Sequence, residues 1–466
     1  MCAMTSPRSL SEVWSEAENV RKSHPHSFSD QIVADIYENA EQITKHVLSK
    51  KGGQRISIDQ KIDNLVTSKW LGYPLMLFLL VGVFWITIEG ANIPSGFLAT
   101  GLFAFQDQLT LWFQWIGAPD WVHGVLVLGV YRTAAWVIAV MLPPMAIFFP
   151  LFTLLEDSGY LPRIAFNLDH IFKKAKACGK QSLTMCMGFG CNAAGVTACR
   201  IIDSPRERLI AILTNNFVPC NGRFPTLIAI TSIFIGSAIA SYSGLVNALV
   251  ITGIILLGVG VTLLVSWLLS ITILKGEPSS LILELPSYRR PKIGAVIYRS
   301  MIDRTLFVLR RAIIVAAPAG GVIWILANVY VGDQSILSTV AHALNPLGQL
   351  IGLDGFILMA FILGLPANEI VLPILIMSYL STGNLQDFTS LEGLRTVLVS
   401  NGWTWLTAVN VLLFSLLHWP CATTLLTTFK ETGSKKWTFI SFLIPTLVGL
   451  TACFILTQVV RLLGLA

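Results

Sequence analysis

Six side chains inside apolar stretches of the sequence could bind a cation. They are three thiols, two amides and one carboxyl group, at Cys191, Asn192, Cys220, Asn368, Glu369 and Cys421. Thiolates are soft ligands, whereas amide and carboxylate oxygens are harder. A mixed set therefore suits a first-row divalent metal such as Fe²⁺, Mn²⁺ or Zn²⁺ better than Mg²⁺ or Ca²⁺. A carboxylate within an apolar membrane segment is costly and marks a functional site by default, so Glu369 is the strongest candidate.

These residues lie in a pattern that occurs twice. When Gly188 is aligned with Gly364, Asn192 falls on Asn368, and each copy is followed by a Pro-Cys pair that contains Cys220 or Cys421. Glycine and proline break a membrane helix, and non-helical backbone is tolerated at membrane depth where it lines a cavity. Broken helices at matching positions in two halves of a chain indicate a transport site near the bilayer midplane. The alternative is that these residues only kink packed helices.

His418, Glu156 and Asp157 are weaker candidates as metal ligands. His418 precedes Trp419-Pro420, where it could bind metal or only pack between helices. Glu156 and Asp157 end an apolar stretch, where they could release metal or pair with a base such as Arg163. The sequence has no Cys-x-x-Cys or His-x-x-x-His pair, which disfavours a closed structural zinc site. A conducted ion should instead be held weakly at several sites.

The composition is that of a membrane protein. The chain has 466 residues, of which 54% are hydrophobic and only 12% are charged, whereas soluble proteins carry roughly 25% charged residues. We expect an all-α polytopic membrane protein of about eight membrane segments. The net charge of +6 is explained by basic residues that set the membrane topology, and no nucleic-acid partner is expected. Eight cysteines outside long outward-facing polar segments do not indicate disulfides.

Basic residues between the apolar segments predict the topology. Lys and Arg are frequent in 156–181 and 275–311, which we place in the cytosol, and absent from 90–121 and 331–353, which we place outside. The first repeat then enters as a re-entrant hairpin from the cytosol and the second from outside, so the repeats are inverted. The expected segments are a cytosolic N-terminal part with an amphipathic helix (1–70), a first span with an outer interfacial helix (71–130), the first repeat (131–274), a basic cytosolic loop (275–311), the second repeat (312–436) and a last span (437–466).

The polar N-terminal segment gives no sign of nucleotide chemistry. No Gly-x-x-x-x-Gly-Lys-Ser/Thr sequence occurs anywhere in the chain, so no P-loop nucleotide site is expected in it. The first apolar run begins near Leu71, so no cleavable signal peptide is expected. Apolar residues between Asp30 and Lys50 keep helical spacing, which predicts either a membrane-surface helix or a docking helix for a partner.

Several motifs in order along the chain resemble the membrane domain of FeoB ferrous iron transporters. Residues 155–163 (LEDSGYLPR), Asp169 and residues 188–192 (GFGCN) resemble the first gate region of that family. Residues 219–225 (PCNGRFP) are similar to its Cys-Ser-Ala-Arg-Leu-Pro segment, and 283–289 (LELPSYR) to its inter-gate loop. Residues 420–423 (PCAT) with 430–433 (KETG) resemble its second gate. The likeness extends from about residue 30 to the end of the chain.

This resemblance implies two inverted gate repeats and inward transport of Fe²⁺ across the cytoplasmic membrane of a prokaryote, with the N-terminus in the cytosol. Fe²⁺ would be the transported substrate, and the chain would be a transporter rather than an enzyme. The family's N-terminal GTPase domain is represented only by what resembles its connecting helix, near residues 30–60, which implies a separately encoded GTPase. A small FeoA-like cytosolic protein and a second copy of the chain are the other implied partners. Ala193-Ala194 stand where the family often has Val-Pro, and Asn368 where many members have Lys.

Two other functions fit the same sequence. A gate-like repeat could carry another divalent metal or a nucleoside-like solute. A protein of a different class, a membrane scaffold or sensor that recruits a soluble partner through residues 1–60, would not transport anything. Metal uptake into proteoliposomes separates these functions.

Overall fold

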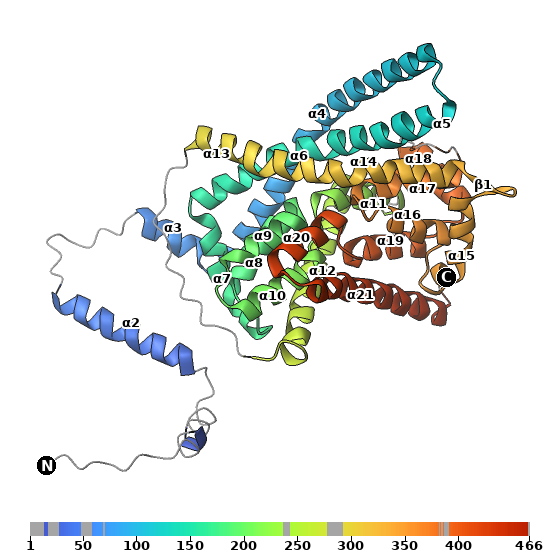
Figure 1. The fold of residues 1–466 in the computed structure, drawn as a ribbon. Helices are drawn as coiled ribbons and strands as arrows, with labels where there is room; N and C mark the ends of the chain where they lie inside the picture. Colours follow the sequence, from blue (N-terminus) through green and yellow to red (C-terminus); the bar gives the residue numbers. More distant parts are fainter. Residues whose placement is uncertain are drawn as a thin grey trace.

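The computed structural model describes residues 14–16, 28–47, 58–68, 70–235, 243–276, 292–381, 383, 385 and 391–464. Much of the expected N-terminal segment and residues 277–291 of the expected basic loop lie outside the described residues. The described chain is helical apart from one antiparallel hairpin, in which β1 (Tyr330–Val331) pairs with β2 (Gln334–Ser335). The expectation of an all-α membrane protein is confirmed (Figure 1).

The first half of the chain runs from α2 to α12. Its elements are α2 (Phe28–Val47), α3 (Ile58–Val66), α4 (Gly72–Ile116), α5 (Asp120–His123), η1 (Gly124–Tyr131), α6 (Arg132–Asp157), α7 (Tyr160–Lys174), α8 (Lys180–Gly190), α9 (Asn192–Ala198), η2 (Cys199–Ile201), α10 (Pro205–Thr214), η3 (Asn215–Phe217), η4 (Asn221–Arg223), α11 (Phe224–Phe234) and α12 (Ser243–Ile271).

The second half runs from α13 to α21. Its helical elements are α13 (Ile293–Arg299), η7 (Ser300–Leu306), α14 (Phe307–Asn328), α15 (Ile336–Leu350), α16 (Gly355–Leu363), η8 (Asn368–Ile370), α17 (Val371–Leu380), α18 (Leu391–Ser400), α19 (Trp405–Leu417), α20 (Ala422–Thr432) and α21 (Lys435–Leu462).

Within the described chain, six helices are long and apolar enough to cross a membrane, or seven if the bent pair α15–α16 is one span. The pair α10–α11 is too short in each part to be counted by length. However, α10 packs against α12 and α21, and α11 packs against α12, α18 and α19, so both parts lie within the helix bundle. The total is close to the eight segments expected.

The long helix α4 differs from the sequence-based expectation. We expected a span that ends near residue 88, then an outer loop with a separate interfacial helix at Trp112, Phe113 and Trp115. Instead, one helix of 45 residues continues to Ile116. Nothing in this apolar run stops the helix until Gly117, whose φ of 70° caps it.

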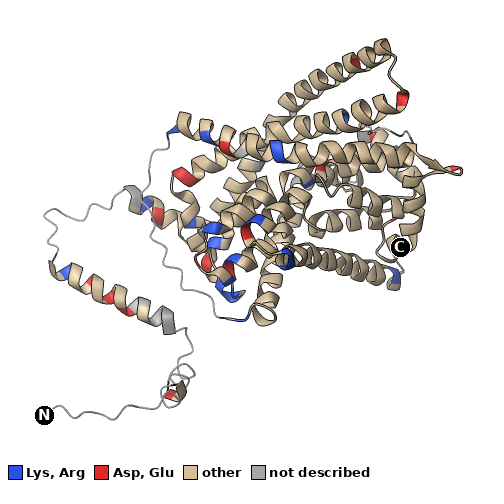
Figure 2. Ribbon diagram, in the orientation of Figure 1, with Lys and Arg blue, Asp and Glu red and all other residues tan. Residues whose placement is uncertain are grey.

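Helix α6 connects the two halves of the core. It packs against α4 on one side and α14 on another, and it also contacts α7, α8 and η8. Where η1 meets α14 the backbones approach closely, because a Cβ on Gly129 would lie 2.9 Å from the Cα of Gly321. Small residues that allow such an approach are typical of packed membrane helices. Lys and Arg gather toward the end of the bundle that holds α7, α8 and α10 (Figure 2).

Candidate metal path

Each repeat contains a helical hairpin that is broken at its tip. In the first, α8 and α9 are separated by Cys191, which is extended (φ −158°, ψ 125°). In the second, Ala367 before η8 is extended in nearly the same way (φ −153°, ψ 121°). These two residues directly precede Asn192 and Asn368. The backbone angles therefore support the alignment of the two repeats.

In each hairpin, a residue at the start contacts a residue at the end, so the chain returns to the side of the bundle from which it entered. Lys180 at the start of the first hairpin forms an ion pair of 2.5 Å with Asp203 just after its end. This hydrogen bond from Lys180 lowers the pKa of the Asp203 carboxyl group. In the second hairpin, the Tyr379 hydroxyl group near the end donates to Asp354, which caps the start of α16. Both elements are therefore re-entrant, as expected.

The hairpins open at opposite ends of the bundle. The crossing formed by α19 and α20 reaches both ends. Near its start, Trp403 Nε1 donates to the Tyr379 hydroxyl group at 2.9 Å, beside the second hairpin. Near its end, Glu431 accepts two hydrogen bonds from Arg200, at 2.7 and 2.8 Å, beside the first hairpin. This opposite placement is the geometry of an inverted repeat.

A small central cavity of about 30 Å³ lies where the broken helices meet. The structure brings six of the predicted residues to its wall: Cys191, Asn192, Cys220, Asn368, Glu369 and Cys421. Methionines of α6, small residues of α14 and Thr423 of α20 complete the lining. Glu369 is 6% exposed, and within the described part of the chain no Lys or Arg forms an ion pair with it.

Two details shape the polar side of this cavity. Asn368 Nδ2 donates to Cys220 Sγ at 3.9 Å, while its buried Oδ1 has no hydrogen-bond partner among the described residues. Gly222 lies against the Glu369 carboxylate, since a Cβ on Gly222 would be 2.3 Å from Oε1. The cavity wall thus offers the Asn368 Oδ1 atom to a ligand. The Glu369 carboxylate lies beside it, in space that only a glycine at position 222 leaves free.

The ligands are not arranged as a closed metal cage. In the portion of the chain that the structure describes, no group of three or more His, Cys, Asp or Glu side chains is close enough to hold a metal ion. Coordination by several of the cavity residues would therefore require their side chains to move. A loose ligand set is what conduction needs, because a permeating ion must also leave.

The three weaker candidates lie elsewhere. The His418 ring is 1% exposed, and its Nδ1 lies 3.0 Å from the carbonyl oxygens of both Phe414 and Ser415, so it packs at the end of α19 and does not line the cavity. Glu156 lines a different, larger cavity, and Asp157 lines neither.

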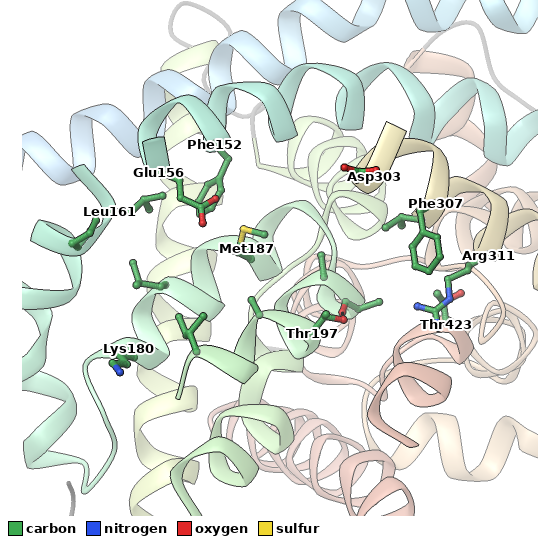
Figure 3. A pocket seen from close by; sticks show the side chains of 17 residues that line it. Phe152, Glu156, Leu161, Lys180, Met187, Thr197, Asp303, Phe307, Arg311 and Thr423 are labelled. Carbon is green, nitrogen blue, oxygen red and sulfur yellow. Dashed lines mark hydrogen bonds between the residues drawn. The ribbon is translucent and has the colours of Figure 1, made fainter. Parts of the chain in front are cut away.

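This larger cavity, which we call the vestibule, has a volume of about 600 Å³ (Figure 3). Its walls are mostly apolar and include Phe152, Met187 and Phe307, while charged residues stand at Glu156, Lys180, Asp303 and Arg311. Val308 and Thr423 line both the vestibule and the central cavity, so the two adjoin. Ala193 and Ala194 also line the vestibule, where bulkier residues would narrow it.

A third cavity of about 290 Å³, which we call the outer pocket, lies at the other end of the bundle. It is lined by hydroxyl groups and one carboxylate, including Ser335, Ser338, Ser378, Ser381 and Asp333. Sequence reasoning did not single out this pocket, because its residues come mainly from the end of α14, the β1–β2 hairpin, α15 and α17 and share no motif.

Arg223 is a buried charged residue that sequence reasoning did not select as a candidate. It was visible as a charged residue within a break, but nothing in the sequence indicated its partners. In the structure it is 1% exposed and its guanidinium group contacts carbonyl oxygens from both repeats. A buried ionisable group at membrane depth is itself the signal that could have identified it.

Comparison with known proteins agrees with this architecture. A family model described as "Gate: Nucleoside recognition" matches residues 138–234 and 309–435. A second model, "Ferrous iron transport protein B C terminus", matches residues 251–303 between them. The chain is a FeoB-type membrane domain. No solved structure matches it.

Curated FeoB proteins align with most of the chain. A protein named Fe(2+) transporter FeoB from Staphylococcus aureus is 29% identical over 430 residues, which is 90% of this chain and 62% of that protein. The FeoB of Methanocaldococcus jannaschii is 27% identical over 474 residues, 97% of this chain and 67% of the relative. A fusion of Fe(2+) transport protein A and FeoB from Porphyromonas gingivalis is 26% identical over 442 residues, covering 83% of this chain and half of the fusion. The chain thus spans about three fifths of the length of the S. aureus relatives.

Proposed function

We propose that this chain moves Fe²⁺ inward across the cytoplasmic membrane of a prokaryote. The observation that carries the proposal is the central cavity, where breaks of both repeats place three thiols, one carboxylate and two amides around one small space. The FeoB relatives support iron as the cargo, since they are named as Fe(2+) transporters.

The sizes of the cavities favour a metal ion over an organic solute. A cavity of about 30 Å³ has room for about one water molecule. An ion must therefore shed most of its hydration shell there, and the carboxylate, thiols and Asn368 Oδ1 can replace that shell. A nucleoside-like solute does not fit. In the vestibule of about 600 Å³ the ion would regain water before release.

The orientation and partners belong to the same proposal. The basic end of the bundle faces the cytosol with the N-terminus, and the vestibule opens there. Since these 466 residues hold no P-loop sequence, a nucleotide-driven step would depend on an FeoB-type GTPase domain outside them. An FeoA-like protein, suggested by the fused relative, and a second copy of the chain are the other proposed partners. The uptake assay below, run with and without an added FeoB-type GTPase domain and GTP, tests the first of these.

The test is the initial rate of Fe²⁺ uptake into proteoliposomes under reducing conditions at matched protein levels. Glu369→Gln removes the charge that offsets a bound cation, and ligand changes commonly cost roughly 10-fold to 100-fold in metal affinity or activity. We expect that loss for Glu369→Gln, and a smaller loss for Cys191→Ser and Cys421→Ser. Cys453→Ser is the matched control, because the Cys453 thiol is buried elsewhere and donates to the Asn410 carbonyl oxygen at 3.6 Å.

Two outcomes would contradict the proposal. A wild-type rate for Glu369→Gln, or a Cys453→Ser defect as large as the other cysteine defects, would place the path elsewhere. Absence of any uptake by the wild-type protein, with and without the GTPase domain, would favour the scaffold or sensor function.

A further inference from the structure

Arg223 is held by a ring of oxygen atoms that both repeats contribute. Its Nη1 donates to the carbonyl oxygens of Asn216 and Leu416, each at 2.8 Å. Its Nη2 donates to Asn216 Oδ1 at 3.0 Å and to the carbonyl oxygens of His418 and Trp419, each at 3.2 Å. Five oxygen atoms thus surround one fully buried guanidinium group.

Among the described residues, no carboxylate balances this charge. In the described part of the chain no Asp or Glu forms an ion pair with Arg223, and arginine stays protonated in proteins. The positive charge is stabilised by carbonyl oxygens that the breaks at the ends of η3 and α19 leave without helical partners. The negative end of the α19 dipole also lies at this guanidinium group, since the Leu416 carbonyl oxygen at that end accepts from it.

Such a ring is also a good environment for a metal ion that prefers oxygen. Ca²⁺ takes six to eight oxygen ligands, including backbone carbonyls. The ring lies beside the central cavity, because Cys220 and Gly222 on the same short segment line that cavity. In the second repeat, Thr424 holds the place of Arg223 after the Pro-Cys pair, and its hydroxyl group lies 3.2 Å from its own Cys421 Sγ. The Pro-Cys pattern therefore does not require a positive charge three residues after its cysteine, and only the first repeat has one.

We propose that Arg223 fills an oxygen-lined cation site with its own charge, so that a divalent ion in the central cavity binds on the thiol and carboxylate side and is not trapped by the carbonyl groups. Arg223 is thus a specificity-determining residue that excludes oxygen-preferring cations such as Ca²⁺. The effect of Arg223 on Fe²⁺ transport rests on the proposed function. The proposal that its guanidinium group fills a cation site does not.

The experiment compares wild-type protein with Arg223→Ala and Arg223→Lys, each purified and shown to be monodisperse. Binding of radioactive Ca²⁺ is measured by equilibrium dialysis, and inhibition of Fe²⁺ uptake by Ca²⁺ is measured in proteoliposomes. Arg461→Ala is the matched control, because Arg461 Nη2 also donates to a backbone carbonyl oxygen, that of Gln349 at 2.8 Å, but at the exposed far end of α21. If Arg223→Ala is not monodisperse, Arg223→Gln takes its place.

We expect Arg223→Ala to gain one saturable Ca²⁺ site per chain. Inhibition of iron uptake should then need roughly 10-fold less Ca²⁺, the lower end of what ligand changes do to metal affinity. Arg223→Lys, which keeps the charge, and Arg461→Ala should behave as the wild type does. A folded Arg223→Ala that binds no more Ca²⁺ than the wild type overturns the proposal, and so does Arg223→Lys if it gains the same site. Failure of wild-type iron uptake would refute the proposed function, while the Ca²⁺ binding result would still decide the role of Arg223.

Discussion

Glu369 owes its position to a glycine on another helix. The carboxylate occupies the space where a side chain on Gly222 would be, because a methyl carbon there would lie only 2.3 Å from Oε1. Neither residue reveals this contact in the sequence, because 147 positions separate them. The close approach makes Gly222 a sensitive test of the cavity geometry.

Gly222→Ala is expected to displace the Glu369 carboxylate and to lower Fe²⁺ uptake. Overpacking of this kind costs roughly 1–3 kcal/mol in the free energy of unfolding, so the melting temperature in detergent should also fall. Gly253→Ala is the control, since nothing lies within 4 Å of a Cβ at that helical position. Equal Fe²⁺ uptake by the two variants would show that transport does not depend on the present position of the Glu369 carboxylate.

At this scale the sequence was informative about residue type but not about contacts. The cost of burying a carboxylate made Glu369 a candidate, and the repeated Pro-Cys pairs made Cys220 and Cys421 candidates. These signals are local in the sequence, and all three residues line the central cavity. His418 had the same local signals, yet its ring hydrogen-bonds to its own helix. The role of Arg223 depends on carbonyl groups about 200 positions away, which no local pattern encodes.

Among the elements, the broken hairpins were the most predictable part of the fold. Glycine, proline and asparagine residues indicated where the helices break, because such residues favour interruption of a membrane helix where the backbone lines a cavity. The length of α4 was not predictable from the loss of basic residues after residue 90, because charge marks the side of the membrane and not the end of a helix. The vestibule could not be predicted either, as it forms between α6, α8, α9 and α14.

The contact between α9 and α20 gives a prediction about opening toward the cytosol. Arg200, just after α9, and Glu431 on α20 join these elements through a bidentate ion pair at the basic end of the bundle. Arg200 is largely exposed, so solvent screens the pair and its loss should change an opening equilibrium only modestly. Glu431→Gln should therefore speed alkylation of Cys421 from the cytosolic side by up to about fivefold.

The charge-reversed double variant Arg200→Glu/Glu431→Arg serves as the control for that measurement. It restores the attraction with the charges exchanged, so the alkylation rate should return toward that of the wild type. If the double variant is as fast as Glu431→Gln or faster, the ion pair does not hold the two elements together.

For the whole molecule, helix α14 borders all three cavities. Phe307 and Arg311 line the vestibule, Ala312 the central cavity and Ala327 the outer pocket. The 15 residues between Ala312 and Ala327 correspond to about 22 Å of helix. The pockets at the two ends therefore lie on opposite sides of the small central cavity, an arrangement that fits an inverted repeat.

Sidedness follows from this arrangement. A cysteine at Lys174→Cys, on the exposed basic end of α7, should react with a membrane-impermeant maleimide only from the cytosol. A cysteine at Val340→Cys, exposed on α15 beside the outer pocket, should react only from outside. The background should lack other reactive thiols. Reaction of both from one side would refute the inverted topology.

The small size of the central cavity also has a consequence for times when no iron is moving. A space of about 30 Å³ holds roughly one water molecule, so among the described residues the central cavity itself has no room for a file of water. Protons hop along such files, and a prokaryotic membrane stores its energy as a proton gradient. Under the proposed function, this conformation would close the iron route to protons, and a cell could keep the route in its membrane without dissipating that gradient.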